Sequence, residues 1–323
     1  MSKFIGRKVE AALALETSRG AGKAPAYSLG KIDFNVYDKT VDARQVESLG
    51  HISDSSDKYV LEKYAQGNMS GHLGANTAAY LMALAFGGAV STGSPTDSVY
   101  PHTIPLDNDN VHQSGALLVK DDDRTLMHKL LMLESFGMEV TLEDLVSWEA
   151  EFISKVGVTS TQSMPTYVED YKFTKRKAKI YIADDISGLA AASALSLKQF
   201  SITVNKNLTR DSSLGTVEPE DILNREISIE GQLRLNYTDQ TFKNYMLDAS
   251  RKAMRISLES EKLIGSTTYG SIEIDLPKVD FFSWEPDAGL PDIVAQQINF
   301  KANYDLTDGL VESVTVNNAL TTI

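Results

Sequence analysis

The feature that most constrains this chain is an internal repeat, because the same series of short elements occurs twice along its 323 residues. Apolar and polar residues alternate in the first of these elements, which is the period of a half-buried strand. The matching segments are, in order, 32–36 with 200–204, 69–73 with 229–233, 77–84 with 238–245, and 142–152 with 290–300. The shared order favours a duplication, although two β-rich halves can also match by chance.

The offset between matching segments falls from 168 residues for the first pair to 148 for the last. The first copy therefore has additional residues, and the Gly-, Ser-, Pro- and Asp-rich tract Gly87–Asp123 supplies them as a predicted long loop. The segment Val156–Tyr167 has the composition of a linker. We therefore expect a first domain over residues 1–160, with its insertion near 87–123, and a second domain over residues 161–323.

Short alternating segments dominate the second half and predict strands. They are Lys179–Ala183, Leu197–Asn205, Glu226–Asn236, Ala253–Leu258, Ser271–Leu276 and Gln297–Tyr304. A helix is expected over Asp239–Arg251, capped by Thr238 or Asp239. In the first half an amphipathic helix is expected over Asp121–Phe136. The predicted fold class is mainly β with short helices (α+β), as two tandem β-sandwich or half-barrel domains, each with a flanking helix.

Composition argues against several classes of function. The chain carries 31 basic and 44 acidic residues, a formal net charge of -13, which is the wrong sign for gripping nucleic acid. It contains no cysteine and no HExxH pair, GxSxG elbow or complete phosphate-binding loop. No apolar stretch reaches the length of a membrane span. We therefore expect a folded protein without catalytic, cofactor-binding or metal-binding residues, although an enzyme of unknown type remains a third alternative.

The second half resembles the tail tube (major tail) proteins of long-tailed, siphovirus-like bacteriophages over about residues 172–318. The resemblance is carried by LSLKQFSITVNKNLTRDSSLG, EISIEGQLRLNYTDQTFKNYM, GSIEIDLPKVDF and PDIVAQQINFKANYD. The first half is similar more faintly, through LGKIDFNVYDK and GNMSGHLGANTAAYLMALAFG. It departs from the family pattern in the insertion from Gly87 to Asp123.

This resemblance implies a structural virion protein that self-assembles into stacked rings, forming a tail tube through which DNA is delivered. Family rings hold six tube domains, so three two-domain chains would close a pseudo-sixfold ring, with six chains as the alternative. A tape-measure protein and a tail terminator are the implied partners, together with assembly in the host cytoplasm. An acidic lumen would suit such a conduit, because it repels DNA phosphates.

The resemblance also assigns the long loop after the first strand of each domain to subunit or ring-to-ring contacts. These loops are Asp38–Lys58 and Lys206–Asp221. The residues expected to make contacts there are Asp42, Arg44, Asp54, Arg210 and Asp211.

The alternative function is a monomeric tandem β-sandwich that binds carbohydrate, as an adhesin or baseplate module would. Exposed aromatic residues on one face would support it, because sugars stack on aromatic rings. The candidates are Trp148, Trp284, Tyr167 and Tyr171.

Overall fold

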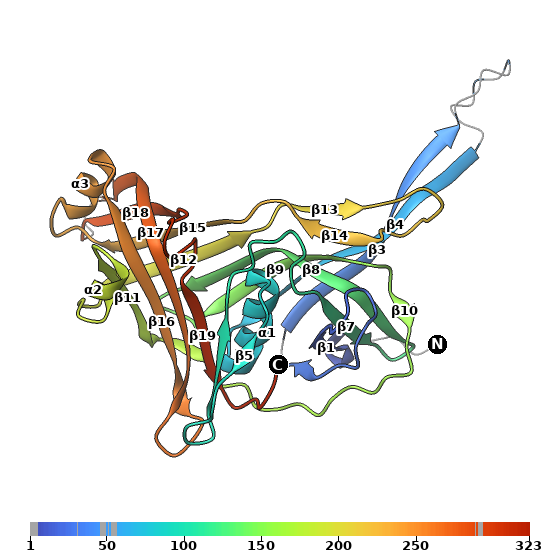
Figure 1. Cartoon of the computed structure of the whole chain (residues 1–323), viewed down its shortest axis with the longest axis horizontal. Coiled ribbons are helices and arrows are strands. Elements are labelled where there is room, and N and C mark those ends of the chain that lie inside the picture. The colour runs from blue at the N-terminus through green and yellow to red at the C-terminus, as the bar shows by residue number, and fades with distance from the viewer. Residues whose placement is uncertain are drawn as a thin grey trace.

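The structure is a computed structural model that describes residues 6–30, 32–45, 50, 52, 57–287, 289 and 293–323. Antiparallel strands make up most of it, with three short α-helices, which confirms the predicted β-rich α+β class (Figure 1). The helices are α1 (Ala75–Phe86), α2 (Ile186–Leu189) and α3 (Thr241–Leu247), and a 3₁₀ turn spans Gly6–Lys8. The strands are β1 (Glu10–Leu15), β2 (Tyr27–Leu29), β3 (Ile32–Gln45), β4 (Asp57–His72), β5 (Ser91–Thr92), β6 (Tyr100–Ile104), β7 (Gly115–Lys120), β8 (Thr125–Val140), β9 (Ser147–Ser154), β10 (Val158–Thr159), β11 (Phe173–Ala183), β12 (Leu197–Asn205), β13 (Leu208–Asp211), β14 (Asp221–Asn224), β15 (Ser228–Asn236), β16 (Arg251–Leu263), β17 (Tyr269–Asp287), β18 (Ala295–Ala302) and β19 (Ser313–Asn318).

Eight strands form a continuous antiparallel sheet across the molecule. Their order is β3-β4-β9-β8-β12-β15-β18-β17. The first four strands come from the first half of the chain and the last four from the second half. The β8–β12 pair joins the two groups, so that β3 and β17 lie at opposite ends of the sheet (Figure 1).

The other ends of the long strands β8 and β17 belong to two smaller groups of strands. β8 lies between β7 and β10 there, and β1 pairs with β7. β17 lies between β16 and β19, and β11 pairs with β16. The two groups, β1-β7-β8-β10 and β11-β16-β17-β19, therefore have the same topology. Each of the two long strands serves two sheets.

The ladders of the two halves of the chain match in register. Gly67 lies between Val36 and Phe152, and Gly231 lies between Ile202 and Phe300. By the ladders, Val36 corresponds to Ile202 and Gly67 corresponds to Gly231. The matches made from the sequence alone were therefore displaced by two residues in the first strand and by four in the second. The last match, which includes Phe152 with Phe300, agrees with the ladders.

Two β-bulges also occur at matching places in the halves. The β8–β9 ladder is interrupted at Glu134, and the β17–β18 ladder is interrupted at Phe282. A second interruption lies at Ala116 in β7 and at Ala253 in β16. Because a bulge bends its strand and shifts the register, matching bulges give the two halves the same curvature.

Helix α1 is buried over its whole length and fills the space between the sheets. The aromatic ring of Tyr80, in this helix, stacks on the ring of Tyr27, and the two ring centroids lie 5.2 Å apart. The Asp170 carboxylate accepts hydrogen bonds from the Asn76 amide (2.8 Å) and the Thr77 hydroxyl (2.6 Å) in the first turn. A carboxylate is favoured there because the first amides of a helix lack backbone partners. The helix ends at Gly87, which adopts a positive φ of 78°.

Several predicted elements differ from the structure. The helix expected over Asp121–Phe136 is wrong, because β8 covers most of that segment as a strand packed on both faces, which removes the period of two. The tract Gly87–Asp123 is not one loop, since it contains β5, β6 and the buried β7. Helix α3 is shorter than expected, and the Asp239 carboxylate accepts a hydrogen bond from its Thr241 amide at 2.9 Å.

Candidate functional site: a polar sheet face with two open edges

One face of the eight-stranded sheet is polar from end to end. Alternate residues of each strand point into the core, and the residues between them form cross-strand rows on the other side. We call this surface the polar face. Its rows are Asn35–Asn68–Glu151–Ser135–Asn205–Ser228, Asp33–Ser70–Glu149–Gly137–Thr203–Glu230–Lys301–Asp280, His72–Ser147–Glu139–Ser201–Gln232–Asn299–Ser283, Gln199–Arg234–Gln297–Glu285, and Asn236–Ala295–Asp287.

The polar face is strongly acidic. Arg234 and Lys301 are its two cations, and each is held by a carboxylate of the same face: Arg234 by Asp287 at 2.6 Å and Lys301 by Glu230 at 2.8 Å. The carboxylates of these rows are Asp33, Glu139, Glu149, Glu151, Glu230, Asp280, Glu285 and Asp287. Eight carboxylates against two cations leave a formal charge of -6, so the face repels polyanions.

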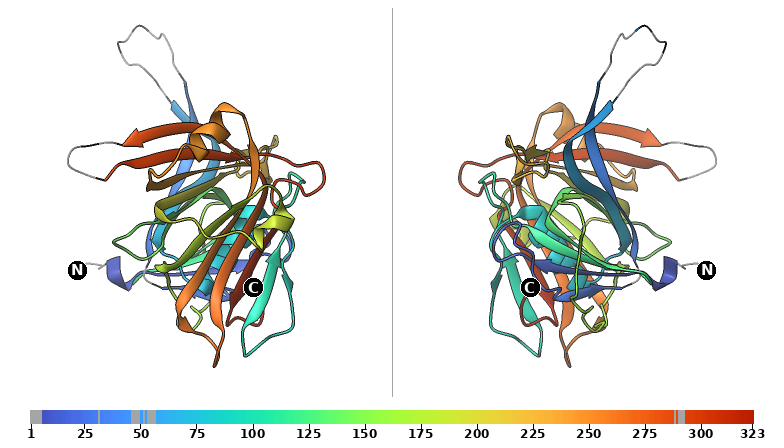
Figure 2. Two further views of the ribbon diagram at one scale, coloured as in Figure 1. Left: turned by 90° about the vertical axis from the view of Figure 1, so that its left-hand side faces the viewer. Right: turned by 90° about the vertical axis from the view of Figure 1, so that its right-hand side faces the viewer.

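Both ends of the sheet present unpaired strand edges. In the part of the chain that the structure describes, β3 pairs only with β4, and the segment Phe281–Asp287 of β17 pairs only with β18. The side views show the ends of β17 and β18, and the β3–β4 hairpin, projecting beyond the body (Figure 2). An exposed edge offers free amides and carbonyls to another strand, so each edge can accept one.

In the first predicted contact loop, Asp38–Lys58, most of the described residues are strand. It forms the outer part of the β3–β4 hairpin, which we call the arm (Figure 1). Asp42 forms an ion pair with Lys58 at 3.1 Å, and hydrogen bonds from the Thr40 hydroxyl and from Lys58 lower the pKa of its carboxyl group. Arg44 lies opposite Lys58 near the outer end of the arm. Asp54 lies outside the described residues.

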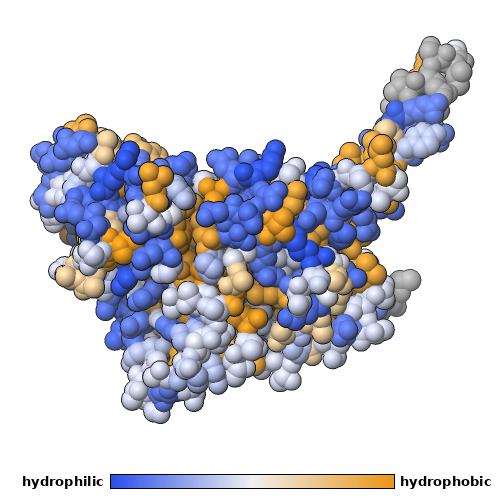
Figure 3. All heavy atoms as spheres, viewed as in Figure 1, coloured by the Kyte–Doolittle hydropathy of each residue, from blue (hydrophilic) through white to orange (hydrophobic). Residues whose placement is uncertain are grey.

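Apolar side chains are exposed on the arm. Val41, Tyr59 and Leu61 are 39%, 53% and 56% exposed, and apolar residues gather where the arm leaves the body (Figure 3). A projecting hairpin that exposes apolar side chains is suited to a partner rather than to solvent.

The second predicted contact loop, Lys206–Asp221, is also a hairpin, made of β13 and β14. It folds back over the first half of the chain. Leu208 and Ile222 pack there against Met132 and Ile153, next to the acidic rows.

Arg210 fixes this hairpin to the base of the arm. Its guanidinium binds Glu62 through two hydrogen bonds, of 2.7 and 3.3 Å, and lies 3.9 Å from the ring centre of Tyr64. Asp211 is exposed at the end of β13, where its carbonyl accepts from the Glu220 amide. The structure thus brings Arg210 against the first loop, whereas Asp42 and Arg44 lie farther out along the arm.

A buried lysine, missed in the sequence, anchors the same hairpin. Lys206 is 1% exposed and donates from Nζ to the Leu84 carbonyl (2.7 Å) in the last turn of α1. Burial, with a contribution from the nearby Arg19, lowers its pKa to about 7. The sequence did contain a signal, because Lys206 continues the core-facing positions of Phe200, Ile202 and Val204.

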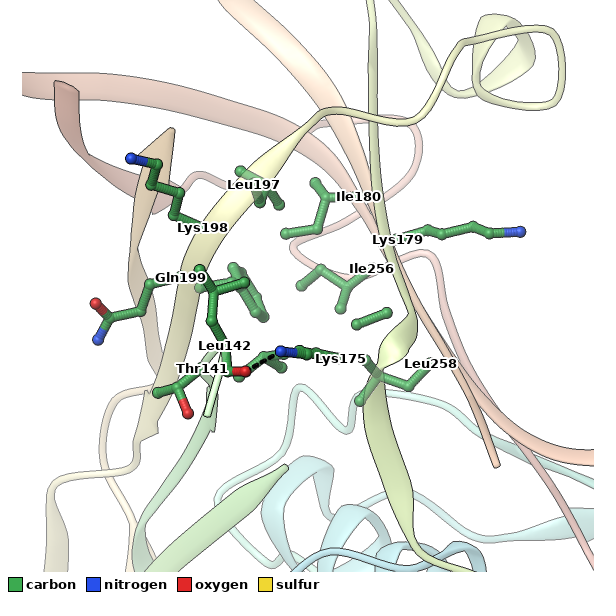
Figure 4. Close-up of a pocket in the computed structure, with 13 residues that line it drawn as sticks. Thr141, Leu142, Lys175, Lys179, Ile180, Leu197, Lys198, Gln199, Ile256 and Leu258 are labelled. Atoms are coloured by element: carbon green, nitrogen blue, oxygen red, sulfur yellow. Dashed lines mark hydrogen bonds between the residues drawn. The ribbon is translucent and has the colours of Figure 1, made fainter. Parts of the chain in front are cut away.

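The pocket that most resembles a ligand site is open to solvent and has no catalytic or metal-binding chemistry of its own. It has a volume of about 120 Å³ and lies between β8, β11, β12 and β16. In Figure 4 the side chains of Lys179 and Lys198 point away from it, and Lys175 donates to the Leu142 carbonyl. The remaining lining is mostly aliphatic, so this cavity is the open end of a β-sandwich core.

The aromatic residues considered for sugar binding do not form a platform. Trp148 is buried in the core, and Trp284 is half-buried and donates to Gln296 at 2.9 Å. They lie on β9 and β17, in opposite halves of the sheet. Tyr167, which is half-exposed, comes from the irregular segment after β10.

The described residues contain neither a cluster of metal ligands nor a membrane-spanning helix. Within the described ranges, no group of three His, Cys, Asp or Glu side chains is placed to hold a metal ion. None of the helices described is both long and apolar enough to cross a membrane.

A family model described as phage tail tube protein matches residues 6–302, nearly the whole chain. A search of curated proteins finds no match.

Proposed function

Since this chain belongs to the phage tail tube protein family, we propose that it self-assembles head to tail into rings that stack into a tail tube. The observation that carries the proposal is the eight-stranded sheet with one acidic face and an unpaired strand at each end. A heterologous contact between the β3 and β17 edges repeats from copy to copy. It closes into a ring when a whole number of rotations from one copy to the next adds up to 360°.

The proposed ring contains three chains. Each chain contributes two matching groups of four strands, which we propose belong to two tandem domains over residues 1–160 and 161–323. Three chains then supply six such groups and a pseudo-sixfold ring, whereas a ring of six chains would have twelve. A tape-measure protein inside the tube and a terminator at its end are the partners that family membership implies.

In this arrangement the polar face lines the lumen. Its excess of carboxylates supports the proposal of an acidic conduit, since phosphates that are repelled by the wall do not bind to it. DNA then passes without specific contacts. The ring would carry no catalytic function, and the protein would be assembled in the host cytoplasm into the virion tail.

Electron microscopy of the purified protein at high concentration tests this proposal. End-on averages should show rings or tubes with six lobes, and native mass spectrometry should count three chains per ring. A ring whose inner surface proved mainly basic would refute the acidic conduit. Monomers that stay dispersed at every concentration would contradict self-assembly and favour the monomeric binding module instead.

A further inference from the structure

We propose that the β8–β12 joint inside each chain is the template for the joint between chains, so that β17 of one copy pairs antiparallel with β3 of the next in the same register. This inference rests on the proposed ring and specifies the contact that builds it. It names the partner of each edge, which is a second copy of this chain, and the residues that lie opposite one another.

The equivalence of the strands comes from the ladders. β17 occupies in the second half the place that β8 has in the first, because their bulges at Phe282 and Glu134 face matching partners on β18 and β9. β3 matches β12, because Val36 lies opposite Gly67 as Ile202 lies opposite Gly231. The two strands at the free edges of the sheet, β17 and β3, therefore correspond to β8 and β12, the two strands that meet in its middle.

The internal joint fixes the register of the external one. Inside the chain, Ser201 lies opposite Glu139, Thr203 opposite Gly137 and Asn205 opposite Ser135. Carried over by the repeat, the corresponding pairs between copies are Asn35 with Asp287, Tyr37 with Glu285 and Lys39 with Ser283.

Burial supports this joint. Phe200 and Ile202 of β12 are 3% and 2% exposed, whereas their counterparts Phe34 and Val36 of β3 are only half-buried. On the other side, Phe136 of β8 is buried and its counterpart Trp284 is half-buried. The residues that the internal joint covers are thus left partly open at both free edges, and a second copy covers them.

Charge at the joint between copies differs from charge at the internal joint. Inside the chain Gln199 donates to Glu139 at 2.6 Å, and between copies Asp33 and Asp287 take these places. Arg234 holds Asp287 at 2.6 Å and so offsets one of these two negative charges. Pro286 lacks an amide hydrogen, which limits indiscriminate pairing along this edge.

The repeat also places the arm. The β13–β14 hairpin follows β12 and packs its Leu208 and Ile222 on the neighbouring half of the chain. The arm follows β3 and would reach the matching surface of β17 and β18 on the next copy. That surface is hollowed and includes Phe282 and Tyr304, which are 52% and 55% exposed. Val41, Tyr59 and Leu61 of the arm provide the apolar side chains to fill it.

Engineered disulfides test the register directly, because the chain has no cysteine. Three double variants place cysteines at the proposed pairs: Asn35→Cys with Asp287→Cys, Tyr37→Cys with Glu285→Cys, and Lys39→Cys with Ser283→Cys. Each double variant has a matched control at the corresponding pair inside the chain. In the same order, the controls are Ser201→Cys with Glu139→Cys, Thr203→Cys with Gly137→Cys, and Asn205→Cys with Ser135→Cys. The controls are needed because an opposite pair has either the closer or the wider spacing, and these three pairs, two residues apart along the ladder, are all of one type.

We expect each proposed pair to cross-link between chains whenever its control cross-links within one chain, giving dimers and trimers on non-reducing gels. A pair shifted by two residues, Asn35→Cys with Glu285→Cys, should remain monomeric. Rings that cross-link only in the shifted pair, or in none while the controls do, would overturn the register and leave self-assembly intact. Particles that never form rings would overturn the proposed function as well.

A substitution in the hollow tests the arm contact. Phe282→Glu should raise the concentration needed for ring formation by about tenfold or more, because it places a charge where the arm packs. Leu247→Glu is the control, since Leu247 is 64% exposed and lies outside the hollow. Equal assembly of Phe282→Glu and the parent protein would contradict the placement of the arm.

Discussion

Arg210 and Glu62 form a two-point ion pair that joins the two long hairpins of the chain, although 148 residues separate them. Nε of Arg210 lies 2.7 Å from Oε1 of Glu62, and both side chains are more than two-thirds buried. The planar guanidinium matches the carboxylate at two points, which restricts its orientation. The β13–β14 hairpin and the base of the arm therefore behave as one unit.

Loss of this pair should loosen the hairpin. Arg210→Ala should lower the free energy of unfolding by about 1–3 kcal/mol, because it leaves the Glu62 carboxylate partly buried without its partner. Chemical denaturation of the dilute protein measures the change. Arg176→Ala is the control, since its pair with Glu261 is mostly exposed and should contribute about 0–1 kcal/mol. A loss no larger than the control's would show that packing alone holds the hairpin.

Lys206 should make stability depend on pH. Its folded pKa of about 7 lies below the usual value of 10.5, so between these values the unfolded chain binds a proton that the folded chain does not. The contribution of Lys206 to the free energy of unfolding therefore rises with pH across that window, by about 1.4 kcal/mol per pH unit.

The groups around Lys206 do not cancel this effect. Arg19 lowers its pKa further and Asp107 acts in the opposite direction, while His112 is neutral above its own pKa of about 4. The test compares the parent protein with Lys206→Met by denaturation from pH 6 to pH 10. The difference between the two should grow with pH above 7. Parallel pH curves would contradict a titrating Lys206.

Two glycines in matching places should resist substitution. A Cβ added to Gly67 would lie 2.1 Å from the Asn35 carbonyl oxygen, and one added to Gly231 would lie 2.3 Å from the Ser201 carbonyl oxygen. Gly67→Ala and Gly231→Ala should each cost about 1–3 kcal/mol of stability, because the backbone must move.

Gly137→Ala is the matched control for these substitutions. Its Cβ would meet nothing closer than 3.8 Å, and Gly137 lies on the polar face of the same sheet. Thermal unfolding of the three variants should show a clear loss for the first two alone. Equal melting temperatures in all three would show that the sheet tolerates a Cβ at every position.

The charge of the polar face should decide whether tubes retain DNA. Replacing Glu139, Glu149 and Glu151 by Lys changes the formal charge of each face from -6 to 0 and puts three lysines close together. Assembled tubes of this variant should bind short DNA in low salt and release it as salt rises, whereas parent tubes should not bind. Sedimentation of tubes with labelled DNA measures retention.

A control separates a local effect from total charge. Glu259→Lys, Glu261→Lys and Glu273→Lys reverse three carboxylates on β16 and β17, outside the polar face, and so change the total charge as much as the lumen variant does. Tubes of the control variant should retain less DNA than those of the lumen variant, even if charge at the outer surface attracts some. Equal retention would place the DNA-facing surface elsewhere.

Much of the β-structure could be predicted from alternation. The segment Leu197–Asn205 coincides with β12, and the other strands expected in the second half overlap with β11, β15, β16, β17 and β18. These strands have one face in the core and one on the polar face, so a period of two appears in their sequences. The first half of β8 was missed because residues on both of its faces are buried there, and its leucines at spacings of three and four imitate a helix.

The sequence by itself determined the repeated order of strands, the alternation that makes one face polar, and the excess of acidic residues. Only the tertiary structure decided which strands meet: β8 joins β12, the β13–β14 hairpin covers the other half, and Lys206 reaches the end of α1. The physical reason is that alternation records which face of a strand is buried, whereas the choice of neighbouring strand depends on register, bulges and chain closure. Those properties arise only when distant segments are packed together.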